Sequence, residues 1–229
     1  ASTGLGEEKK KEVCVVQGDA NVAIALLEQP WNHIFFTGSP VIGSKVMAAA
    51  SRYLASVTLE LGGKSPVFVH ESYGAEAAGA RVAWAKGLNA GQVCIAPDYV
   101  LVPTALRDDF LKGFRAGIER HYGSQPSTNT DWVRIIGPRH WDRLKEWLDE
   151  AVESGAQVWQ PDAPNRARLY FPPTLIWDAP EHIQVSCSEI FGPILPVFTY
   201  ARVEDALARV NAGPKPLVLT VMSHAKSWT

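Results

Sequence analysis

Asn-Ala-Gly-Gln-Val-Cys-Ile-Ala-Pro-Asp-Tyr, residues Asn89–Tyr99, is the stretch around which this 229-residue chain is organised. It joins a helix-like segment to the strand-like run Tyr99–Val102, and it contains a single cysteine, Cys94. Gly91 permits a tight turn and Pro97 stops a helix from continuing, so the pattern predicts a loop immediately before a strand. A thiol held there can face a cleft beside free backbone N–H groups, which a cysteine nucleophile and its oxyanion require. A small buried hydrophobe is the simpler interpretation of a lone cysteine, and spacing alone favours it.

Three further motifs accompany this loop in the sequence. Phe-Thr-Gly-Ser at Phe36–Ser39, with Gly43, and Leu-Glu-Leu-Gly-Gly-Lys at Leu59–Lys64 lie upstream, and Ser-Glu-Ile-Phe-Gly-Pro at Ser188–Pro193 lies downstream. In this order the four motifs resemble the aldehyde dehydrogenase superfamily, most of all its class 3, fatty aldehyde dehydrogenase-like branch. The resemblance covers nearly the whole chain but only the middle part of what such an enzyme contains. It therefore implies a chain truncated at both ends, without the first strands of the cofactor domain and without the C-terminal oligomerisation segment.

The first part of the chain alternates between strand-like and helix-like segments. Strands are predicted at Val13–Val16, Ile34–Thr37 and Val57–Leu61, and helices over Ala20–Gln29 and from Pro40 to about Tyr53. Ser39 is suited to cap the second helix, with Pro40 at its first position. The alternation is typical of a doubly wound parallel sheet. The expected fold is α/β: a three-layer, partial doubly wound parallel sheet in a dinucleotide-binding half (residues 1–62), followed by an aldehyde dehydrogenase-type catalytic α/β domain (residues 63–229).

The rest of the chain continues the α/β pattern. Strands are predicted at Val67–Val69, Tyr99–Val102, Phe171–Trp177, Ile194–Phe198 and Leu217–Met222, and helices at Ala75–Leu88, after a Thr104 cap, from Pro138 onward and at Val203–Val210. Gly123–Asp131 and Pro161–Arg168 are predicted loops that shape the mouth of the pocket. Because a partial cofactor sheet leaves one parallel edge uncovered, we expect the chain to form a homo-oligomer.

The glycine turn at Gly38, Ser39 and Gly43 is a candidate cofactor site. Orphan N–H groups at a helix start attract anions, and the resemblance implies contact with a dinucleotide phosphate; an ordinary capped helix would give the same pattern. The tripeptide Pro-Trp-Asn ending at Asn32 matches the one that carries the family's oxyanion-hole asparagine. In the family that asparagine lies well upstream, so we interpret Asn32 as a turn residue and expect the true counterpart to precede residue 1.

The resemblance implies a reaction at four side chains. Cys94 would attack the carbon of an aldehyde or related carbonyl compound to give a thiohemiacetal, and a hydride would pass to NAD or NADP. Glu60 would activate the water that hydrolyses the thioester, and the leucines on either side of it predict apolar surroundings. Glu189 would bind the nicotinamide ribose and Phe191 would pack near the ring. A surface ion pair for Glu60 and core packing for Phe191 are the simpler interpretations, and Lys64 is assigned a structural role.

Composition narrows the class of protein. The formal net charge is −2, from 22 basic and 24 acidic residues, so no nucleic-acid partner is predicted. No apolar run reaches the length of a membrane span, and residues 1–12 read as a solvated start without the apolar core of a signal peptide. Cys14, Cys94 and Cys187 are widely spaced and match neither a disulfide framework nor a zinc pattern. We therefore predict no metal and a reducing, cytoplasmic compartment.

Three functions are compatible with these motifs. The first is NAD- or NADP-dependent oxidation of an aldehyde to a carboxylic acid, with partner chains rebuilding the cofactor domain. The second is an enzyme without a cofactor that reuses the cleft of Cys94 and Glu60 for hydrolase, lyase, cyclase or isomerase chemistry. The third is a non-catalytic remnant that assembles with a full-length relative. Retention of Cys94, Glu60, Glu189 and Phe191 together favours the first, whereas the shortened cofactor domain counts against it.

Overall fold

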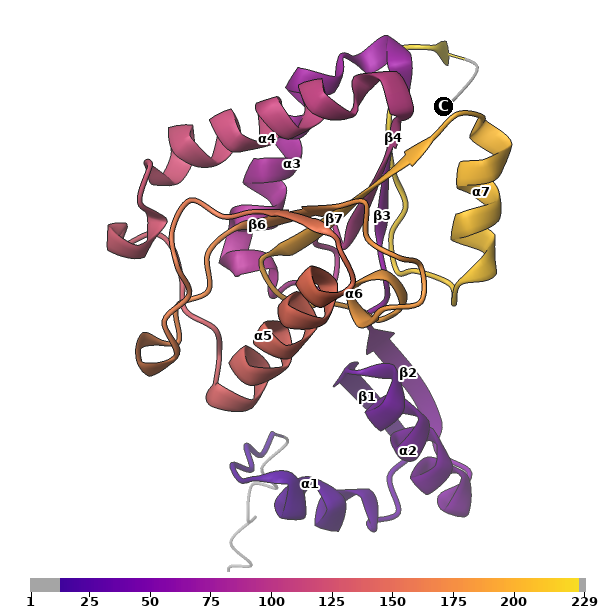
Figure 1. The fold of residues 1–229 in the computed structure, drawn as a ribbon. Coiled ribbons are helices and arrows are strands. Elements are labelled where there is room, and N and C mark those ends of the chain that lie inside the picture. Colours follow the sequence, from indigo (N-terminus) through magenta and orange to yellow (C-terminus); the bar gives the residue numbers. More distant parts are fainter. Residues whose placement is uncertain (1–12, 227–229) are drawn as a thin grey trace, which may run out of the picture. The chain divides into compact units, whose positions relative to one another are not determined.

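The structure, a computed structural model, describes residues 13–226. The chain divides into two compact units, the first ending at Glu60 and the second beginning at Leu61 (Figure 1). We expected a domain boundary two residues later, after Gly62. The solvated start predicted for residues 1–12 lies outside the described residues.

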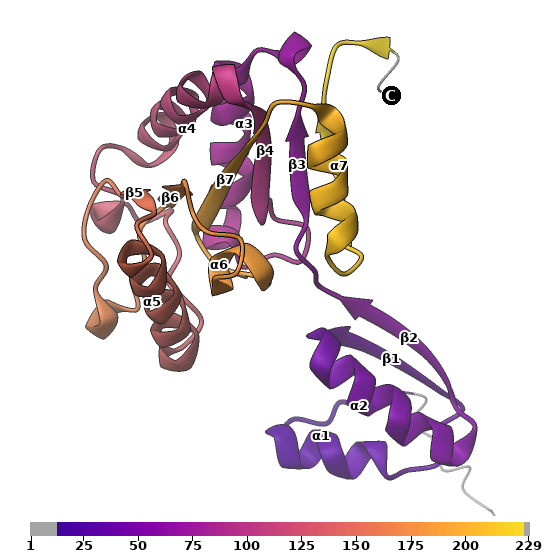
Figure 2. The same cartoon turned by 45° about the vertical axis from the view of Figure 1, so that its right-hand side comes forward.

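The described part of the first unit contains two strands and two α-helices. They are α1 (Ala20–Leu27), β1 (His33–Gly38), α2 (Pro40–Ala50) and β2 (Ser56–Leu61), with the 3-10 helix η1 (Ser51–Tyr53) between the last two. β1 and β2 form a two-stranded sheet, and their arrows run in the same direction (Figure 2). Ser39 caps α2 as predicted, because its hydroxyl accepts a hydrogen bond from Ile42 N–H at 3.4 Å and Pro40 follows in the first turn.

The strand predicted at Val13–Val16 does not form. The segment has no regular structure, and Val13 and Val15 are 79% and 81% exposed. A parallel strand is held by ladder hydrogen bonds to its neighbours, and within the described chain neither β1 nor β2 pairs with this segment. Two of the three strands expected for the cofactor sheet are therefore present among the described residues.

The second unit is built on a six-stranded sheet in the order β5-β6-β7-β4-β3-β8. Its strands are β3 (Pro66–Val69), β4 (Tyr99–Pro103), β5 (Gln157–Trp159), β6 (Thr174–Trp177), β7 (Ile194–Tyr200) and β8 (Thr220–Met222). Its α-helices are α3 (Ala75–Gly87), α4 (Arg107–Tyr122), α5 (Pro138–Glu153), α6 (Gln184–Cys187) and α7 (Val203–Ala212). The 3-10 helices η2 (Glu71–Tyr73), η3 (Leu88–Gly91), η4 (Thr104–Leu106), η5 (Pro126–Thr128) and η6 (Arg166–Arg168) lie in the connections. Neighbouring strands pair in parallel except β5 and β6, which are antiparallel, so the predicted α/β class is confirmed.

Helices cover both faces of this sheet, which gives three layers (Figures 1 and 2). α3 and α4 pack on the face that includes Val100 of β4 and Leu195 of β7. α5 packs on the other face, against Ile194, and α7 contributes Ala206 beside Leu101 on that same face. Val100 and Leu101 belong to different layers because successive residues of a strand point to opposite faces.

Several elements of the second unit differ from the predicted ones. β6 begins at Thr174, three residues later than predicted, because Pro172 and Pro173 cannot donate ladder hydrogen bonds. β5 and α6 were not predicted, since elements of three and four residues are too short for periodicity to indicate them. Thr104 does not cap α4. It is the first residue of η4, which precedes α4, and its hydroxyl donates to Tyr200 O at 3.1 Å.

Candidate active site

Three of the sequence motifs lie directly before three adjacent strands of the six-stranded sheet. Lys64 precedes β3, the Cys94 loop (residues 89–98) precedes β4, and Glu189–Pro193 precedes β7. These strands are neighbours in the order β7-β4-β3, and they all run in parallel. Parallel strands begin at the same edge of a sheet. The topology therefore gathers the three motifs at the amino ends of β3, β4 and β7.

Cys94 lies in a short turn between η3 and β4. The turn is closed by Ala96 N–H, which donates to Val93 O at 3.0 Å. Cys94 is partly buried, whereas Ile95 beside it is 57% exposed. The loop predicted at this place is therefore present, and it holds the thiol outside the buried core.

The backbone before Cys94 is left-handed over three successive residues. The angle φ is 50° at Asn89, 51° at Ala90 and 71° at Gly91. A Cβ at Gly91 would collide with the carbonyl oxygen of Gly192, so only glycine allows this close approach between the two backbones. The contact joins the Cys94 loop to the downstream motif.

Asp98 and Lys64 form a buried ion pair that connects all three motifs. Lys64 Nζ lies 2.5 Å from Asp98 Oδ2, and the side chains are 10% and 5% exposed. The other Asp98 oxygen accepts a hydrogen bond from Ile190 N–H at 2.8 Å. Lys64 Nζ also donates to Val185 O at 2.7 Å and to Ser188 O at 3.0 Å. Both charges are thus paired and further hydrogen-bonded, as buried ions must be.

Phe191 has an uncommon backbone conformation, with φ at +46°. This region is strained for a bulky residue and persists only where the surroundings hold the chain in it. The preceding Ile190 is held on both sides, because Asp98 accepts from its N–H and Arg143 Nη2 donates to its carbonyl at 2.7 Å. The Phe191 side chain is among the exposed large hydrophobic residues, at 38%. It is therefore not a core side chain, which was the simpler interpretation of the sequence.

The Glu189 carboxylate lies against the glycines of the Leu59–Lys64 motif. A Cβ at Gly62 would collide with both carboxylate oxygens, and Gly63 N–H donates to the carboxylate. Burial raises the pKa of Glu189; the Gly63 hydrogen bond and two nearby cations oppose that shift, and Asp98 adds to it. Glu189 is thus held at the same edge of the sheet as the Cys94 loop.

Lys86 is a buried cation that belongs to none of the sequence motifs. It lies in the last turn of α3 and is 1% exposed, and its Cε is 3.2 Å from the position a Cβ would take at Gly91. Burial lowers the pKa of Lys86 to about 8. Attraction to Asp98 and Glu189 opposes this shift, whereas repulsion from Lys64 adds to it. The electrostatic environment of the candidate site therefore includes a lysine that loses its proton readily.

Replacing Lys86 with methionine is expected to stabilise the fold below pH 8 and to lose that advantage at higher pH. The pKa of Lys86 is about 8 in the folded chain against 10.5 for an ordinary lysine, so between these values the unfolded chain binds more protons and wild-type stability rises with pH. The difference in unfolding free energy should shrink by on the order of 3 kcal/mol across that range. Urea unfolding of both proteins at several pH values measures it. Lys112→Met, at a lysine that is 69% exposed, is the control; an equal pH dependence in the control would contradict the prediction.

The glycine-turn residues lie in the first unit. Gly38 ends β1, Ser39 caps α2, and Gly43 is buried within α2. Gly43 N–H donates to Ser39 O at 2.9 Å, as in an ordinary helix start. Asn32 lies in a bend before β1, where its carbonyl accepts from Ser56 N–H at 3.2 Å, and this position is compatible with its interpretation as a turn residue.

Glu60 is exposed in β2, which corrects the expectation of apolar surroundings. Side chains alternate along a strand, so Leu59 and Leu61, which are partly buried, point to the face opposite Glu60. Glu60 is the last residue of the first unit and Cys94 belongs to the second. The structure thus brings together Lys64, Cys94, Glu189 and Phe191, and it describes Glu60 and the glycine turn within the other unit.

Comparison with known proteins places this arrangement in a family. Residues 9–227 match the model described as "Aldehyde dehydrogenase family". The chain belongs to the aldehyde dehydrogenase family. It is 42% identical over 216 residues to a probable coniferyl aldehyde dehydrogenase of Pseudomonas aeruginosa, covering 94% of this chain and 45% of that protein. It is 35% identical over 210 residues to the dimeric NADP-preferring aldehyde dehydrogenase of Rattus norvegicus, covering 92% of this chain and 45% of that protein.

Solved aldehyde dehydrogenase structures share the fold. The substrate-bound state of Staphylococcus aureus AldH superposes with a TM-score of 0.87 at 34% identity, over 93% of this chain and 46% of that one. The NAD+ complex of Mycobacterium tuberculosis aldehyde dehydrogenase gives a TM-score of 0.81 at 26% identity, over 92% and 45%. The chain therefore spans about half the length of the relatives it matches.

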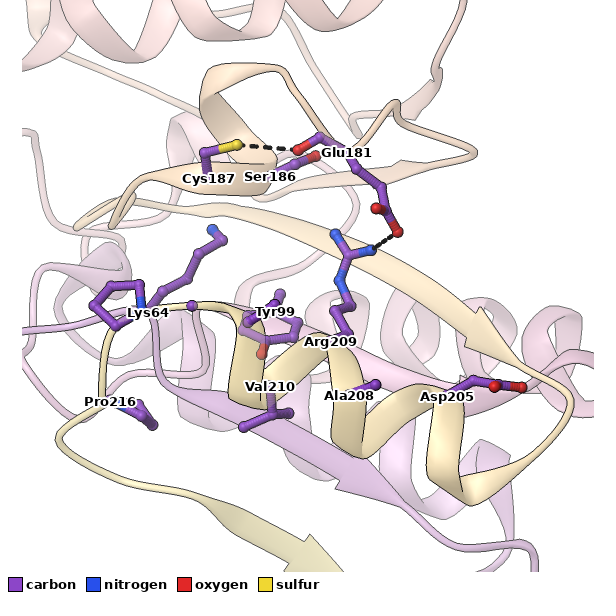
Figure 3. Close-up of a pocket in the computed structure, with 13 residues that line it drawn as sticks. Lys64, Tyr99, Glu181, Ser186, Cys187, Asp205, Ala208, Arg209, Val210 and Pro216 are labelled. Atoms are coloured by element: carbon purple, nitrogen blue, oxygen red, sulfur yellow. Dashed lines mark hydrogen bonds and ion pairs between the residues drawn. The ribbon is translucent and has the colours of Figure 1, made fainter.

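A cavity of about 630 Å³ in the second unit of the chain adjoins the Lys64 side chain (Figure 3). Tyr99 and Arg209 line it, and Arg209 Nη1 donates to Glu181 Oε1 at 2.7 Å. Cys187 is also in the lining, and its thiol donates to the Glu181 carbonyl at 3.0 Å. Because the cavity is lined by Cys187 and not by Cys94, the two thiols have different surroundings, and Cys187 can serve as an internal reference for Cys94.

Two further observations concern residues 13–226 only. No helix in this range is long and apolar enough to cross a membrane. No group of three or more His, Cys, Asp or Glu side chains in the same range is placed to hold a metal ion.

Proposed function

We propose that this chain carries the reacting part of an NAD- or NADP-dependent aldehyde dehydrogenase, which oxidises an aldehyde to a carboxylic acid with Cys94 as nucleophile. One observation supports this above the others. The Cys94 loop and the Glu189–Pro193 segment are fixed to each other through Asp98 and through the contact of Gly91 with Gly192. A nucleophile and a candidate cofactor contact are thereby held at one edge of one sheet.

In this proposal the residues act in turn on one carbonyl carbon. The Cys94 thiolate adds to the aldehyde carbon, and the oxyanion that forms accepts hydrogen bonds from backbone N–H groups of the Cys94 turn. Loss of hydride from that carbon leaves a thioester on Cys94. Glu60 takes a proton from water as the water attacks the thioester, which releases the acid and the thiol.

The residues of this chain suit a nicotinamide dinucleotide, whose part in the proposal is to accept the hydride. Phe191 is 38% exposed in a held backbone, so its ring is free to contact a flat ring. Glu189 presents a carboxylate, which accepts hydrogen bonds from ribose hydroxyls, at the same edge. Gly38, Ser39 and Gly43 form a capped helix start, which suits a phosphate. We also propose that the chain forms a homo-oligomer.

The relatives suggest which compounds to try first. A relative at 42% identity is named for coniferyl aldehyde, another is named NADP-preferring, and a solved relative is described in complex with NAD+. Coniferyl aldehyde is therefore a suitable first probe, with each cofactor in turn.

Calorimetric titration with NAD and, separately, NADP tests the proposal directly. We expect saturable binding of one or both, and Glu189→Ala should weaken it about tenfold because hydrogen bonds to a charged acceptor are lost. Glu153→Ala, at an exposed position of α5, is the matched control and should bind as the wild type does. If neither cofactor binds, the dehydrogenase proposal is rejected for this chain alone. Attention would then move to cofactor-free chemistry at Cys94 and Glu60.

A further inference from the structure

The Gln92 side chain bridges the Cys94 loop and the segment that precedes α5. Its amide nitrogen donates to Arg134 O at 3.2 Å and to Asn89 O at 3.1 Å. Its amide oxygen accepts from Ile136 N–H at 2.9 Å. Asn89 returns a hydrogen bond, from its side-chain nitrogen to Gln92 O at 3.0 Å. Both amide hydrogens and the amide oxygen of Gln92 are therefore in use.

A carboxamide is the matching partner for this stretch of backbone. The carbonyl of Arg134 and the N–H of Ile136 face the same side of their segment, because both bond to the Gln92 amide. The Gln92 amide offers one donor and one acceptor side by side, because one of its two N–H groups lies on the same side as its C=O. A carboxylate would instead face the carbonyls of Arg134 and Asn89 with lone pairs. A hydrocarbon would leave the Arg134 carbonyl and the Ile136 N–H without the partner that Gln92 supplies, whereas the Asn89 carbonyl would keep its bond from the Gln92 backbone N–H.

The backbone that Gln92 holds is strained. Asn89 and Ala90, both of which carry a Cβ, are in the left-handed region directly before Gly91 and Gln92. Single residues adopt this conformation where their surroundings hold them, and three in succession need such support. The turn that carries Cys94 follows immediately, so the orientation of this turn depends on the direction in which the chain leaves the left-handed residues.

We propose that the Gln92 carboxamide is the positioning residue of the nucleophile, because it fixes the Cys94 turn on the backbone of residues 134–136. The inference rests on the proposed role of Cys94. It also gives the loops Gly123–Asp131 and Pro161–Arg168 a part in positioning the nucleophile. Arg134 Nη2 donates to Ser127 O at 3.3 Å and Ser127 N–H donates to Asp162 Oδ2 at 2.9 Å, so both loops support the segment on which Gln92 rests.

Gln92→Met tests this role, because it keeps the length of the side chain, removes its hydrogen bonds and adds no charge. Gln157→Met, at an exposed position of β5, is the matched control. Iodoacetamide alkylation of the full chain, followed by mass spectrometry of its peptides, gives separate rates for Cys14, Cys94 and Cys187. Amide hydrogen exchange gives the local stability of residues 93–96. Gln92→Met should slow alkylation of Cys94 about tenfold and speed exchange at residues 93–96 about tenfold, with the other two cysteines and β4 unchanged, since small misplacements at a reacting group have effects of this size.

An unchanged Cys94 rate in Gln92→Met would overturn the inference, and so would an exchange increase spread evenly over the second unit, which indicates general destabilisation. A different result would contradict the proposed function: if wild-type Cys94 reacted no faster than Cys187, Cys94 would not be an activated nucleophile. Even in that case the experiment decides the inference about Gln92, because that inference depends only on the difference in Cys94 alkylation rate between the wild type and Gln92→Met. If Gln92→Met does not fold, Gln92→Glu, which keeps the acceptor for Ile136 N–H, is read by the same two measurements.

Discussion

Cys94→Ser is expected to abolish aldehyde oxidation, lowering kcat by about 10³-fold or more. A serine hydroxyl is a far weaker nucleophile than a thiolate, and no other cysteine lies in the loop before β4. The assay follows the absorbance of the reduced nicotinamide with coniferyl aldehyde as substrate. Under the same mechanism, wild-type Cys94 should also be the thiol that reacts fastest with iodoacetamide.

The controls for this prediction are in the same chain. Cys14 and Cys187 are both exposed, and Cys187 lies in the cavity beside Arg209. Cys14→Ser and Cys187→Ser should keep kcat within about twofold of wild type, since surface substitutions away from a site change little. If Cys94→Ser retained more than a tenth of the activity, or if Cys187→Ser lost as much, Cys94 would not be the nucleophile.

The elements around the motifs could be predicted because each has a clear local pattern. Short apolar runs before and after a helical period indicated β3, β4 and β7, and Gly91 with Pro97 indicated the loop. Each motif was recognised by its residues, and its position directly before a strand was visible as well. Adjacent parallel strands then bring the motifs together, so the assembly of the site at one sheet edge follows from topology.

What could not be predicted depends on partners far away in sequence. Asp98 hydrogen-bonds Ile190 and Arg143 hydrogen-bonds the Ile190 carbonyl, and nothing local to any of these residues indicates the pairing. The left-handed backbone of Phe191 is equally without a local signal, because positive φ is usually indicated by glycine. The exposure of Glu60 was open to prediction, since alternation along β2 already separates it from its neighbours.

Lys86 had a signal in the sequence that motif matching overlooks. It follows Ala78 and Val82 at intervals of four residues, and both are fully buried in α3. A lysine on the apolar stripe of a helix that leads into a candidate nucleophile loop is a buried cation beside the site. Helical periodicity applied to charged residues, as well as to apolar ones, would have found it.

Asp98→Ala is expected to destabilise the second unit by about 3–5 kcal/mol, because it leaves the buried Lys64 ammonium without its counter-ion and Ile190 N–H without an acceptor. Asp98→Asn should cost less, since an amide oxygen can still accept from Ile190. Urea unfolding measures each change, and Asp149→Ala, which breaks a half-exposed pair with Lys145, should cost much less, at most about 1 kcal/mol.

The double variant Lys64→Met/Asp98→Asn separates the charge from the hydrogen bonds. Removing both charges leaves no ion buried alone, so the double variant should be more stable than the sum of the two single losses by about 2 kcal/mol. Strict additivity would show that the two side chains contribute independently.

Cofactor binding by the two Asp98 variants completes the test. The hydrogen bond from Ile190 N–H to Asp98 holds the backbone before Phe191. Binding should therefore persist in Asp98→Asn and be lost in Asp98→Ala, at temperatures where both variants are folded. Equal loss in both variants would mean that the charge of Asp98, rather than its hold on Ile190, maintains the arrangement of Cys94 with Phe191.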